Sequence, residues 1–260
     1  LFRSGDLSLG RNPWDNLLKS LGELAYPSFM DIWLGPERLE YRSDDGTVLR
    51  VENRRDVEAH FIAGLGRATW TTFQIATLGS LLAAVLALPL GLLSARNLHA
   101  PKWIACTCST LLDISRAIHT LVFGLVLVGI VGLGPTAGIL AIALHSMGTY
   151  GKLYAESIET LDMGAIDAVR ATGASPSQVF FSAVWPSVLP QFVSNHLYVW
   201  EFNIRDSTIL GLIGAGGLGL LISEAVGLFQ WSRLATIILV VIALVMAFDT
   251  VSRRIRQALL

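Results

Sequence analysis

The stretch "DAVRATGASPSQVFFSAVWPSVLP" (Asp167–Pro190) differs in character from the sequence on either side of it. Its neighbours are strongly apolar, whereas this stretch is rich in small and polar residues and closes on two prolines. Ser175 can cap a helix whose first position is Pro176, and Gln178 stands where a capping box needs it. Gly173 is placed to end a preceding helix. The stretch therefore predicts two short helices joined by a glycine turn.

The composition of the whole chain indicates a membrane protein. Of its 260 residues, 53% are hydrophobic and only 15% are charged, and the mean hydropathy is +0.57. These values lie on the apolar side of the usual soluble mixture. Residues 1–67 hold nine of the 19 Lys and Arg and 11 of the 20 Asp and Glu, so a polar segment precedes an apolar body, 68–260. The net charge of -1 and the lack of a basic run exclude a nucleic-acid-binding protein.

Several apolar stretches are long enough to cross a bilayer. A spanning helix needs about 20 apolar residues, because the hydrocarbon core is about 30 Å thick and a helix rises about 1.5 Å per residue. The predicted spans are Thr71–Ala95, Cys108–Leu133, Pro135–Ala155, Val184–Phe202 and Ala235–Val251. The glycine-rich stretch Ser207–Phe229 predicts a helix continuation or a re-entrant hairpin that protein must bury. The expected fold is an all-α membrane protein, a polytopic helical bundle with about five spans.

The distribution of Lys and Arg predicts the orientation of the bundle, since short cytoplasmic loops carry an excess of both. Positive residues gather in the segments 96–102, 152–170 and 253–256. The segment 156–183 and the C-terminus are therefore expected in the cytoplasm, and residues 1–67 outside. For such a segment to begin outside, one further span is expected before the first residue, with "LF" as its remnant.

Motifs for covalent chemistry or cofactor binding do not account for this chain. The "GAGGLG" of Gly214–Gly219 matches G-x-G-x-x-G, but it lacks the preceding strand of a dinucleotide site and predicts close helix packing. No phosphate-binding loop, H-E-x-x-H or G-x-S-x-G occurs. We expect no catalytic residue, metal or cofactor on this chain. Cys106 and Cys108 are expected to be buried free thiols.

The opening stretch resembles the cytoplasmic signature loop of the membrane permeases of ABC importers. That loop has an acidic-Ala-Ala start, then a glycine, an apolar position and a terminal Leu-Pro. Gly173 is in register with the glycine of that loop. Three residues depart from it: Asp167 stands where Glu is commoner, Val169 replaces the second Ala, and Trp185 replaces the leucine of a first Leu-Pro.

Two further stretches resemble the phosphonate-type branch of this family, whose members import phosphonates, phosphite or hypophosphite. They are "SRAIHTLVFGLVLVGIVGLGPTAG" (Ser115–Gly138) and "EFNIRDSTILGLIGAGGLG" (Glu201–Gly219). With the loop, the similarity covers most of residues 70–255. The resemblance implies the fold of a type I importer permease in the inner (plasma) membrane of a bacterium.

The resemblance also implies partners. A second permease subunit, identical or paralogous, would pair with this chain around a pathway. Two cytoplasmic ATPases would carry ATP and Mg, and an external solute-binding protein would deliver the oxyanion. The loop would be a coupling helix seated in a cleft of an ATPase. The residues expected to couple to the ATPase are Asp167, Ala168, Arg170, Ala171, Gly173, Ala174 and Ser175.

Polar and charged residues inside predicted spans are candidates for the translocation pathway, because a charge in the bilayer is costly unless it faces protein or water. The candidates are Asp113, Arg116, His119, Thr120, Glu201, Asn203, Arg205 and Ser207. The spacing of the first four predicts one side of a single helix. Two interpretations stay open: Arg116 and Arg205 are stations for the oxyanion, or they form internal ion pairs with Asp113 and Glu201.

Two other classes of protein compete with an importer permease. An ion-coupled secondary transporter of a small anion would use buried Asp, Arg and His as a proton relay, without an ATPase. A membrane scaffold would leave the charges within its spans without a purpose. The identity of the oxyanion and the role of the external segment also stay open.

Overall fold

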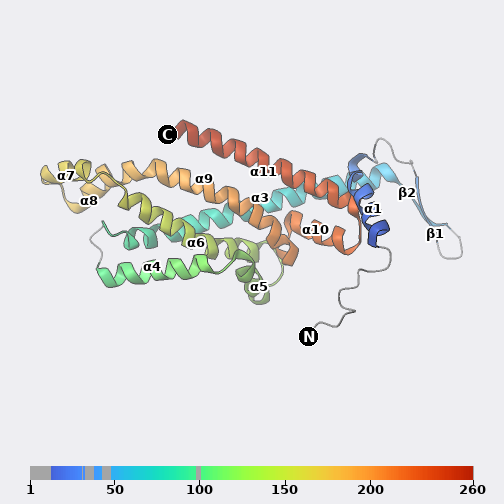
Figure 1. Ribbon diagram of the computed structural model, residues 1–260, viewed down its shortest axis with the longest axis horizontal. Helices are drawn as coiled ribbons and strands as arrows, with labels where there is room; N and C mark the ends of the chain where they lie inside the picture. The colour runs from blue at the N-terminus through green and yellow to red at the C-terminus, as the bar shows by residue number, and fades with distance from the viewer. Residues whose placement is uncertain (1–12, 31, 33–37, 43–47, 98–100, 260) are drawn as a thin grey trace. The chain divides into compact units, whose positions relative to one another are not determined.

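The computed structural model describes residues 13–30, 32, 38–42, 48–97 and 101–259 (Figure 1). The "LF" taken as the remnant of an earlier span lies outside these residues. The chain divides into two compact units. The first comprises Leu1–Ala68 with Leu221–Ile242, and the second comprises Thr69–Leu220 with Ala243–Leu260.

The first unit combines a short helix, a strand pair and parts of two long helices. Its elements are α1 (Pro13–Leu24), β1 (Arg38–Arg42), β2 (Val48–Asn53), the start of α3 (Arg54–Ser94), most of α10 (Gly217–Gly227) and the start of α11 (Trp231–Leu259). The strands pair in antiparallel fashion, with Arg38 opposite Asn53. This ribbon is the only sheet among the described residues. Helix α3 passes residue 67 without a break, so the polar segment leads directly into the first predicted span.

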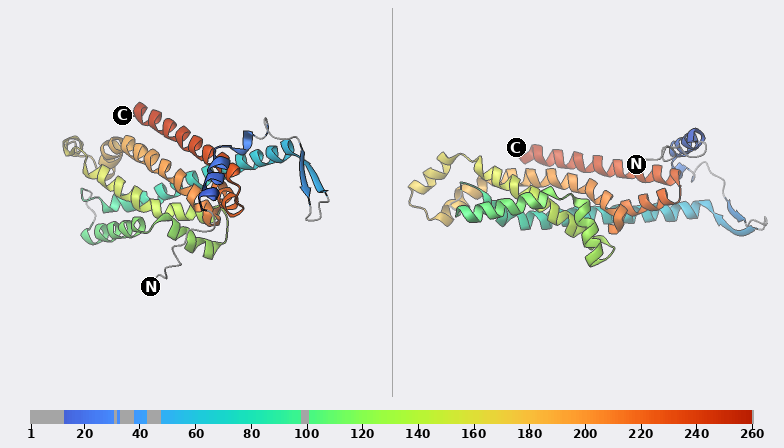
Figure 2. Two further views of the ribbon diagram at one scale, coloured as in Figure 1. Left: turned by 45° about the vertical axis from the view of Figure 1, so that its right-hand side comes forward. Right: turned by 60° about the horizontal axis from the view of Figure 1, so that its bottom comes forward.

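The second unit is a bundle built around one central helix. The central helix is α6 (Pro135–Glu159). Besides parts of α3, α10 and α11, the unit also contains α4 (Lys102–Ala117), α5 (Thr120–Val131), α7 (Met163–Ala171), α8 (Pro176–Val179) and α9 (Trp185–Leu210). Helix α6 packs against α4, α5 and α9, and Figures 1 and 2 show α4, α6 and α9 running side by side. Glycines make the close approach to α4 possible: a side chain added at Gly148 or Gly151 would collide with α4.

The capacity to cross a membrane follows from length and hydropathy. Among the described residues, α3 and α11 are each long and apolar enough to span a bilayer. Two bent helix pairs, α4 with α5 and Pro176–Ala215 with α10, raise the number to four if each pair counts as one span. The stretch Pro135–Ala155, a further predicted span, forms α6. This helix is central and largely covered by its neighbours, so it can carry polar residues that a lipid-facing helix could not.

The prediction of one continuous helix over Cys108–Leu133 is wrong. Helix α4 ends at Ala117, Ile118 is extended (φ -89°, ψ 121°), and α5 starts at Thr120 at an angle of 87° to α4. The imidazole of His119 accepts the backbone N–H of Leu121 (3.3 Å) and so caps the new helix. Consequently Asp113, Arg116, His119 and Thr120 do not share one side of a single helix.

The glycine-rich stretch continues a helix and then breaks it. Helix α9 runs to Leu210, a π-helical segment covers Gly211–Ala215, and α10 follows at an angle of 59°. Gly214 has a φ of +98°, which favours glycine, and a side chain added there would collide with Leu133. A side chain added at Gly219 would collide with the carbonyl of Thr208. Close packing, as expected for "GAGGLG", is confirmed.

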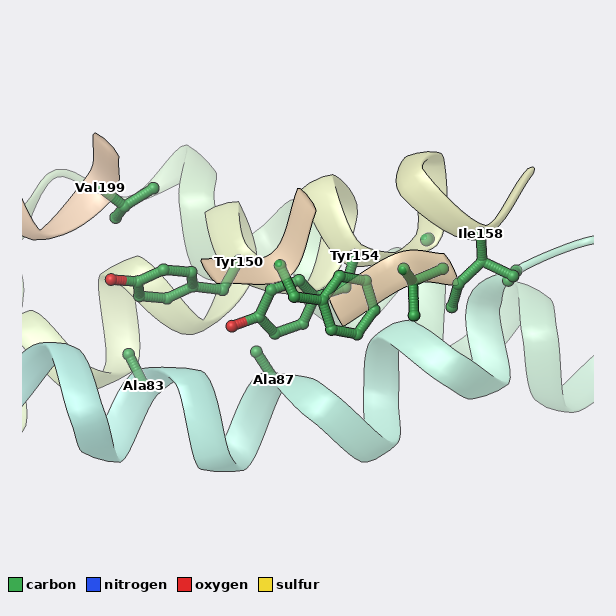
Figure 3. Close-up of a cluster of buried hydrophobic side chains, with 10 residues drawn as sticks. Ala83, Ala87, Tyr150, Tyr154, Ile158 and Val199 are labelled. Atoms are coloured by element: carbon green, nitrogen blue, oxygen red, sulfur yellow. The ribbon is translucent and has the colours of Figure 1, made fainter. Parts of the chain in front are cut away.

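The core of the bundle pairs small residues of α3 with aromatic rings of α6 (Figure 3). Ala83 and Ala87 lie opposite Tyr150 and Tyr154, and all four side chains are buried. The ring of Tyr154 stacks on Phe192 of α9, with centroids 4.2 Å apart. Large-to-small complementarity of this kind lets helices approach closely and fixes the orientation of α6 between its neighbours.

Candidate coupling and translocation sites

The opening stretch of the sequence forms the predicted helix–turn–helix. The capping box is confirmed: Ser175 N–H donates to the side chain of Gln178 (2.8 Å), and Gln178 N–H donates to Ser175 Oγ (3.4 Å). Gly173 ends α7 with a φ of +81°. The start of the helix before the turn was not predicted from the sequence: α6 ends at Glu159, and Asp162 caps α7 as a new helix. The signal for this start in the sequence is Asp162, because Asp is favoured as the capping residue before a helix.

Helices α7 and α8 are fastened by a small apolar core and project beyond the ends of α6 and α9 (Figures 1 and 2). Ile166, Val179, Ala183 and Val184 are buried together beneath the turn. A shallow hollow of about 620 Å³ opens beside it, lined by Val169, Thr172, Gly173, Ala174, Gln178, Phe181 and Ser182. The rigid turn thus presents a small-residue surface next to an open recess.

The seven predicted coupling residues come together on this element. Ala174 is half-buried, and the other six are exposed: Asp167, Ala168, Arg170, Ala171, Gly173 and Ser175. Arg170 pairs with Asp167 at 3.1 Å along α7. The element therefore carries its charge in a local pair and leaves its glycine turn free of bulk.

A charge cluster joins α4 to α6. The carboxylate of Asp113 accepts from Arg116 at 3.0 Å and from Lys152 at 2.8 Å, and Lys152 also donates to Ser109 (2.6 Å). Two cations share one carboxylate, so the three charged residues, named here the α4 cluster, carry one net positive charge. The Arg116 side chain is 54% exposed. In the sequence, Lys152 served only to predict the orientation of the chain in the membrane. Its pairing with Asp113 was not predicted, because it depends on the close approach of α6 to α4.

A second cluster, again of one carboxylate and two cations, joins α9 to α11. Glu201 pairs with Arg205 at 2.9 Å, as the spacing of four predicts, and with Arg256 at 3.8 Å. The guanidinium of Arg205 also lies over the ring of Phe202, 4.6 Å from its centroid. These charged residues, the α9 cluster, again carry one net positive charge. The Arg205 side chain is 46% exposed.

Asn203 and Ser207 lie inside the bundle. The amide of Asn203 donates to Ser80 (2.7 Å) and accepts from Ser146 (2.8 Å), so it links α9 to α3 and α6. Ser207 donates to the carbonyl of Thr72 (3.2 Å). Both residues are almost completely buried. Their hydrogen bonds hold the helices together, which favours a structural part over contact with a passing anion.

His119 and Thr120 lie at the junction of α4 and α5. His119 caps α5, and Thr120 donates to the carboxylate of Asp206 on α9 (2.7 Å). His145 contacts the carbonyl of Ile118 (2.8 Å) across the same junction. The bend between the two helices is therefore fixed by polar contacts to α6 and α9.

The thiols and acidic side chains show no sign of a metal centre. Within the described ranges, no group of three or more His, Cys, Asp or Glu could hold a metal ion. Cys106 and Cys108 are free, as predicted, but neither is fully buried: Cys106 is exposed and Cys108 is half-buried.

The helical bundle around α6 has the architecture of the membrane subunits of ABC importers. The fold agrees with solved structures of that class. An inward-facing conformation of the MetNI methionine ABC transporter superposes with a TM-score of 0.67 at 23% sequence identity. The similarity covers 75% of this chain and 96% of the other.

Sequence comparison places the chain within this class. Residues 87–260 match the family described as binding-protein-dependent transport system inner membrane component, and the chain belongs to that family. HtxC of Stutzerimonas stutzeri, named for phosphite transport, is 40% identical over 189 residues, or 73% of this chain and 67% of HtxC. The phosphite transport system permease PtxC of the same species is 37% identical, over 72% of this chain and 68% of PtxC. The phosphate-import permease PhnE of Mycolicibacterium smegmatis is 33% identical, over 76% of this chain and 37% of PhnE.

Proposed function

We propose that this chain forms the translocation pathway of an ATP-driven importer for a small phosphorus oxyanion: a phosphonate, phosphite or hypophosphite. The observation that carries the proposal is the similarity to HtxC and PtxC, both named for phosphite transport and 40% and 37% identical to this chain. PhnE, named for phosphate import, handles an ion of the same tetrahedral class.

The projecting pair α7–α8 is the proposed contact with a cytoplasmic ATPase. Its glycine turn and exposed alanines allow two backbones to approach closely, and the hollow beside Phe181 can accept a side chain of the partner. ATP and Mg would bind to two such ATPases. A second permease, identical or paralogous, would complete the pathway, and an external solute-binding protein would supply the anion.

This assignment sets the proposed orientation in the inner (plasma) membrane. The segment 156–183, which holds the coupling pair, and the C-terminus lie in the cytoplasm. Residues 1–67 then form an external segment ahead of the permease domain, 68–260. The Lys and Arg of the cytoplasmic loops agree with this arrangement.

The two charge clusters are the proposed stations for the anion. Each has one carboxylate between two cations, so each retains a positive charge that a passing anion can neutralise. Arg116 and Arg205 are about half exposed, and a charge facing lipid would cost at least about 2.5 kcal/mol at the bilayer centre. Their exposed sides are therefore expected to face water or the second permease. The fork of an arginine matches two oxygens of a tetrahedral anion.

Uptake by cells tests the substrate class. The chain is expressed with its ATPase and binding protein in a bacterium lacking importers of phosphorus oxyanions. Uptake of labelled phosphite, hypophosphite and methylphosphonate is measured, with sulfate as the control of similar shape. We expect saturable uptake of at least one phosphorus anion that sulfate does not inhibit. Uptake of sulfate in preference to all three would exclude the proposed substrate class.

A further inference from the structure

Helix α1 carries an apolar stripe that no described part of its unit covers. Trp14, Leu17, Leu18 and Leu21 are 71%, 47%, 67% and 51% exposed. Their spacing of three and four residues puts them on one face of the helix. A surface helix normally turns such a stripe towards the core. In this unit the stripe faces outwards, so something other than the described residues must cover it.

The opposite, polar face of α1 is exposed at Asn16 and Lys19 and borders a hollow of its own unit. Polar residues of the helix and two aromatic rings line a hollow of about 410 Å³: Asn16, Lys19, Ser20, Glu23, Phe229 and Trp231. Ser232 donates to the carbonyl of Glu23 (3.2 Å), and a buried hydrogen bond joins Ser28 to Thr236 (3.1 Å). The C-terminal end of α1 is therefore fixed beside the first turns of α11.

That position lies at the start of a helix that could cross a bilayer. Helix α11 is long and apolar enough to cross a bilayer, and it begins with Trp231, a residue type enriched at the membrane interface. Ile238 and Ile242, about two and three turns further on, are exposed apolar side chains of the same unit, as expected of a surface that faces lipid. The C-terminal end of α1 is thus fixed beside the start of a helix that carries exposed apolar side chains.

The turn before α11 supports this interpretation. Phe229 is 73% exposed and adopts a φ of +54°, a left-handed conformation that is strained for a residue with a side chain. Leu228 beside it is 58% exposed. The unit therefore presents large apolar side chains from two separate elements near the start of one span.

We propose that α1 lies in the plane of the membrane, with Trp14, Leu17, Leu18 and Leu21 inserted at the boundary between lipid headgroups and acyl chains. The occupant of the stripe is phospholipid. An amphipathic helix with Trp and Leu on one face and polar residues on the other has the composition of an interfacial anchor. The anchor would hold the polar segment 1–67 against the bilayer surface beside the start of α11, whichever anion the permease carries.

Spin labelling of the assembled transporter tests this anchor. Cys106 and Cys108 are replaced by Ser, and a nitroxide is attached to Leu18→Cys or, as the control on the polar side of the same helix, to Lys19→Cys. The complex is placed in nanodiscs of phosphatidylethanolamine and phosphatidylglycerol. Power saturation then compares collisions with oxygen, which partitions into lipid, and with a water-soluble nickel chelate. Leu21→Cys repeats the apolar measurement if the first variant fails to assemble.

We expect the label at Leu18 to be accessible to oxygen and protected from nickel, and the label at Lys19 to show the reverse. Equal access to nickel at both positions would overturn the proposal. Protection of Leu18 that arises only when the solute-binding protein is added would assign the stripe to that protein. Dipolar broadening between labels at Leu18 would assign it to a second copy of the chain.

Discussion

Gly173 combines a backbone angle that favours glycine with open space around it. Its φ of +81° would strain most residues by about 1–2 kcal/mol, yet the space around it is open, and an added side chain would meet no atom of this chain within 4 Å. Under the proposed coupling role, the requirement for glycine has two parts: the turn needs the angle, and the ATPase needs the space. Substitutions can separate these parts.

Replacing Gly173 by Asn or Leu tests the docking role. Asn tolerates the left-handed conformation and adds a side chain of moderate size, while Leu adds bulk and strain. We expect Gly173→Asn to keep the thermal stability of the subunit and to uncouple ATP hydrolysis from uptake in part, and Gly173→Leu to abolish coupling. ATPase activity and uptake are measured on the same proteoliposomes. Normal coupled uptake by Gly173→Leu would remove this turn from the ATPase contact.

Arg205 offers a second test at the scale of a residue. Loss of a hydrogen bond to a charged group costs about 1.5–3 kcal/mol, so we expect Arg205→Lys to lower uptake about tenfold or more while assembly and basal ATPase activity persist. Arg205→Ala should also assemble, because Glu201 keeps Arg256 as a neighbour at 3.8 Å.

The control for this prediction is the double variant with Glu201→Gln. If Arg205→Ala assembles poorly and the double variant recovers, the arginine is half of a structural pair. It would then be removed from the proposed pathway.

At the scale of the elements, the sequence predicted local features better than distant ones. The capping box at Ser175 and the stop at Gly173 are set by neighbouring residues, so both could be predicted. The bend at Ile118 could not, because the residues around it contain neither Gly nor Pro and the apolar pattern continues through it. Its polar contacts come from His145 and Asp206, residues far along the chain. The pairing of Lys152 with α4 was missed for the same reason.

Packing of α4 against α6 depends on Gly148. A methyl group added there would lie 2.6 Å from the backbone nitrogen of Arg116, an atom that cannot move without displacing α4. We expect Gly148→Ala to cost about 1–3 kcal/mol and to lower the thermal stability of the purified subunit. The matched control is Gly129→Ala on α5, where an added methyl meets nothing within 4 Å. Equal stability of the two variants would contradict the packing described for α4 and α6.

At the scale of the whole molecule, the composition alone predicted a helical membrane protein, since a chain this apolar has few other folds available. The strand pair β1–β2 and the stripe of α1 were not predicted, because the polar segment lacks the long apolar runs that mark spans. The sequence predicted about five spans, whereas among the described residues at most four are long and apolar enough to cross a bilayer. The difference is the predicted span Pro135–Ala155, which forms α6. This helix lies at the centre of the bundle and needs less apolar surface.

The proposed orientation is tested by labelling single cysteines in intact cells, with Cys106 and Cys108 replaced by Ser. Val51 on β2 and Thr172 in the coupling turn are both exposed, so each can react if the reagent reaches it. We expect an impermeant maleimide added outside to modify Val51→Cys and to spare Thr172→Cys until the cells are opened. Labelling of Thr172→Cys in intact cells would place the coupling pair outside, where no cytoplasmic ATPase could bind it.

The energy source of transport tests the central claim most directly. The permease is reconstituted into proteoliposomes with its partner ATPases, and the loaded solute-binding protein is added outside. Uptake of labelled phosphite is then measured with ATP or a non-hydrolysable analogue inside, each with and without a protonophore. The proposed function predicts uptake that requires hydrolysable ATP and persists when the proton gradient is collapsed. Uptake that proceeds without ATP and stops with the protonophore would identify an ion-coupled transporter and contradict the account.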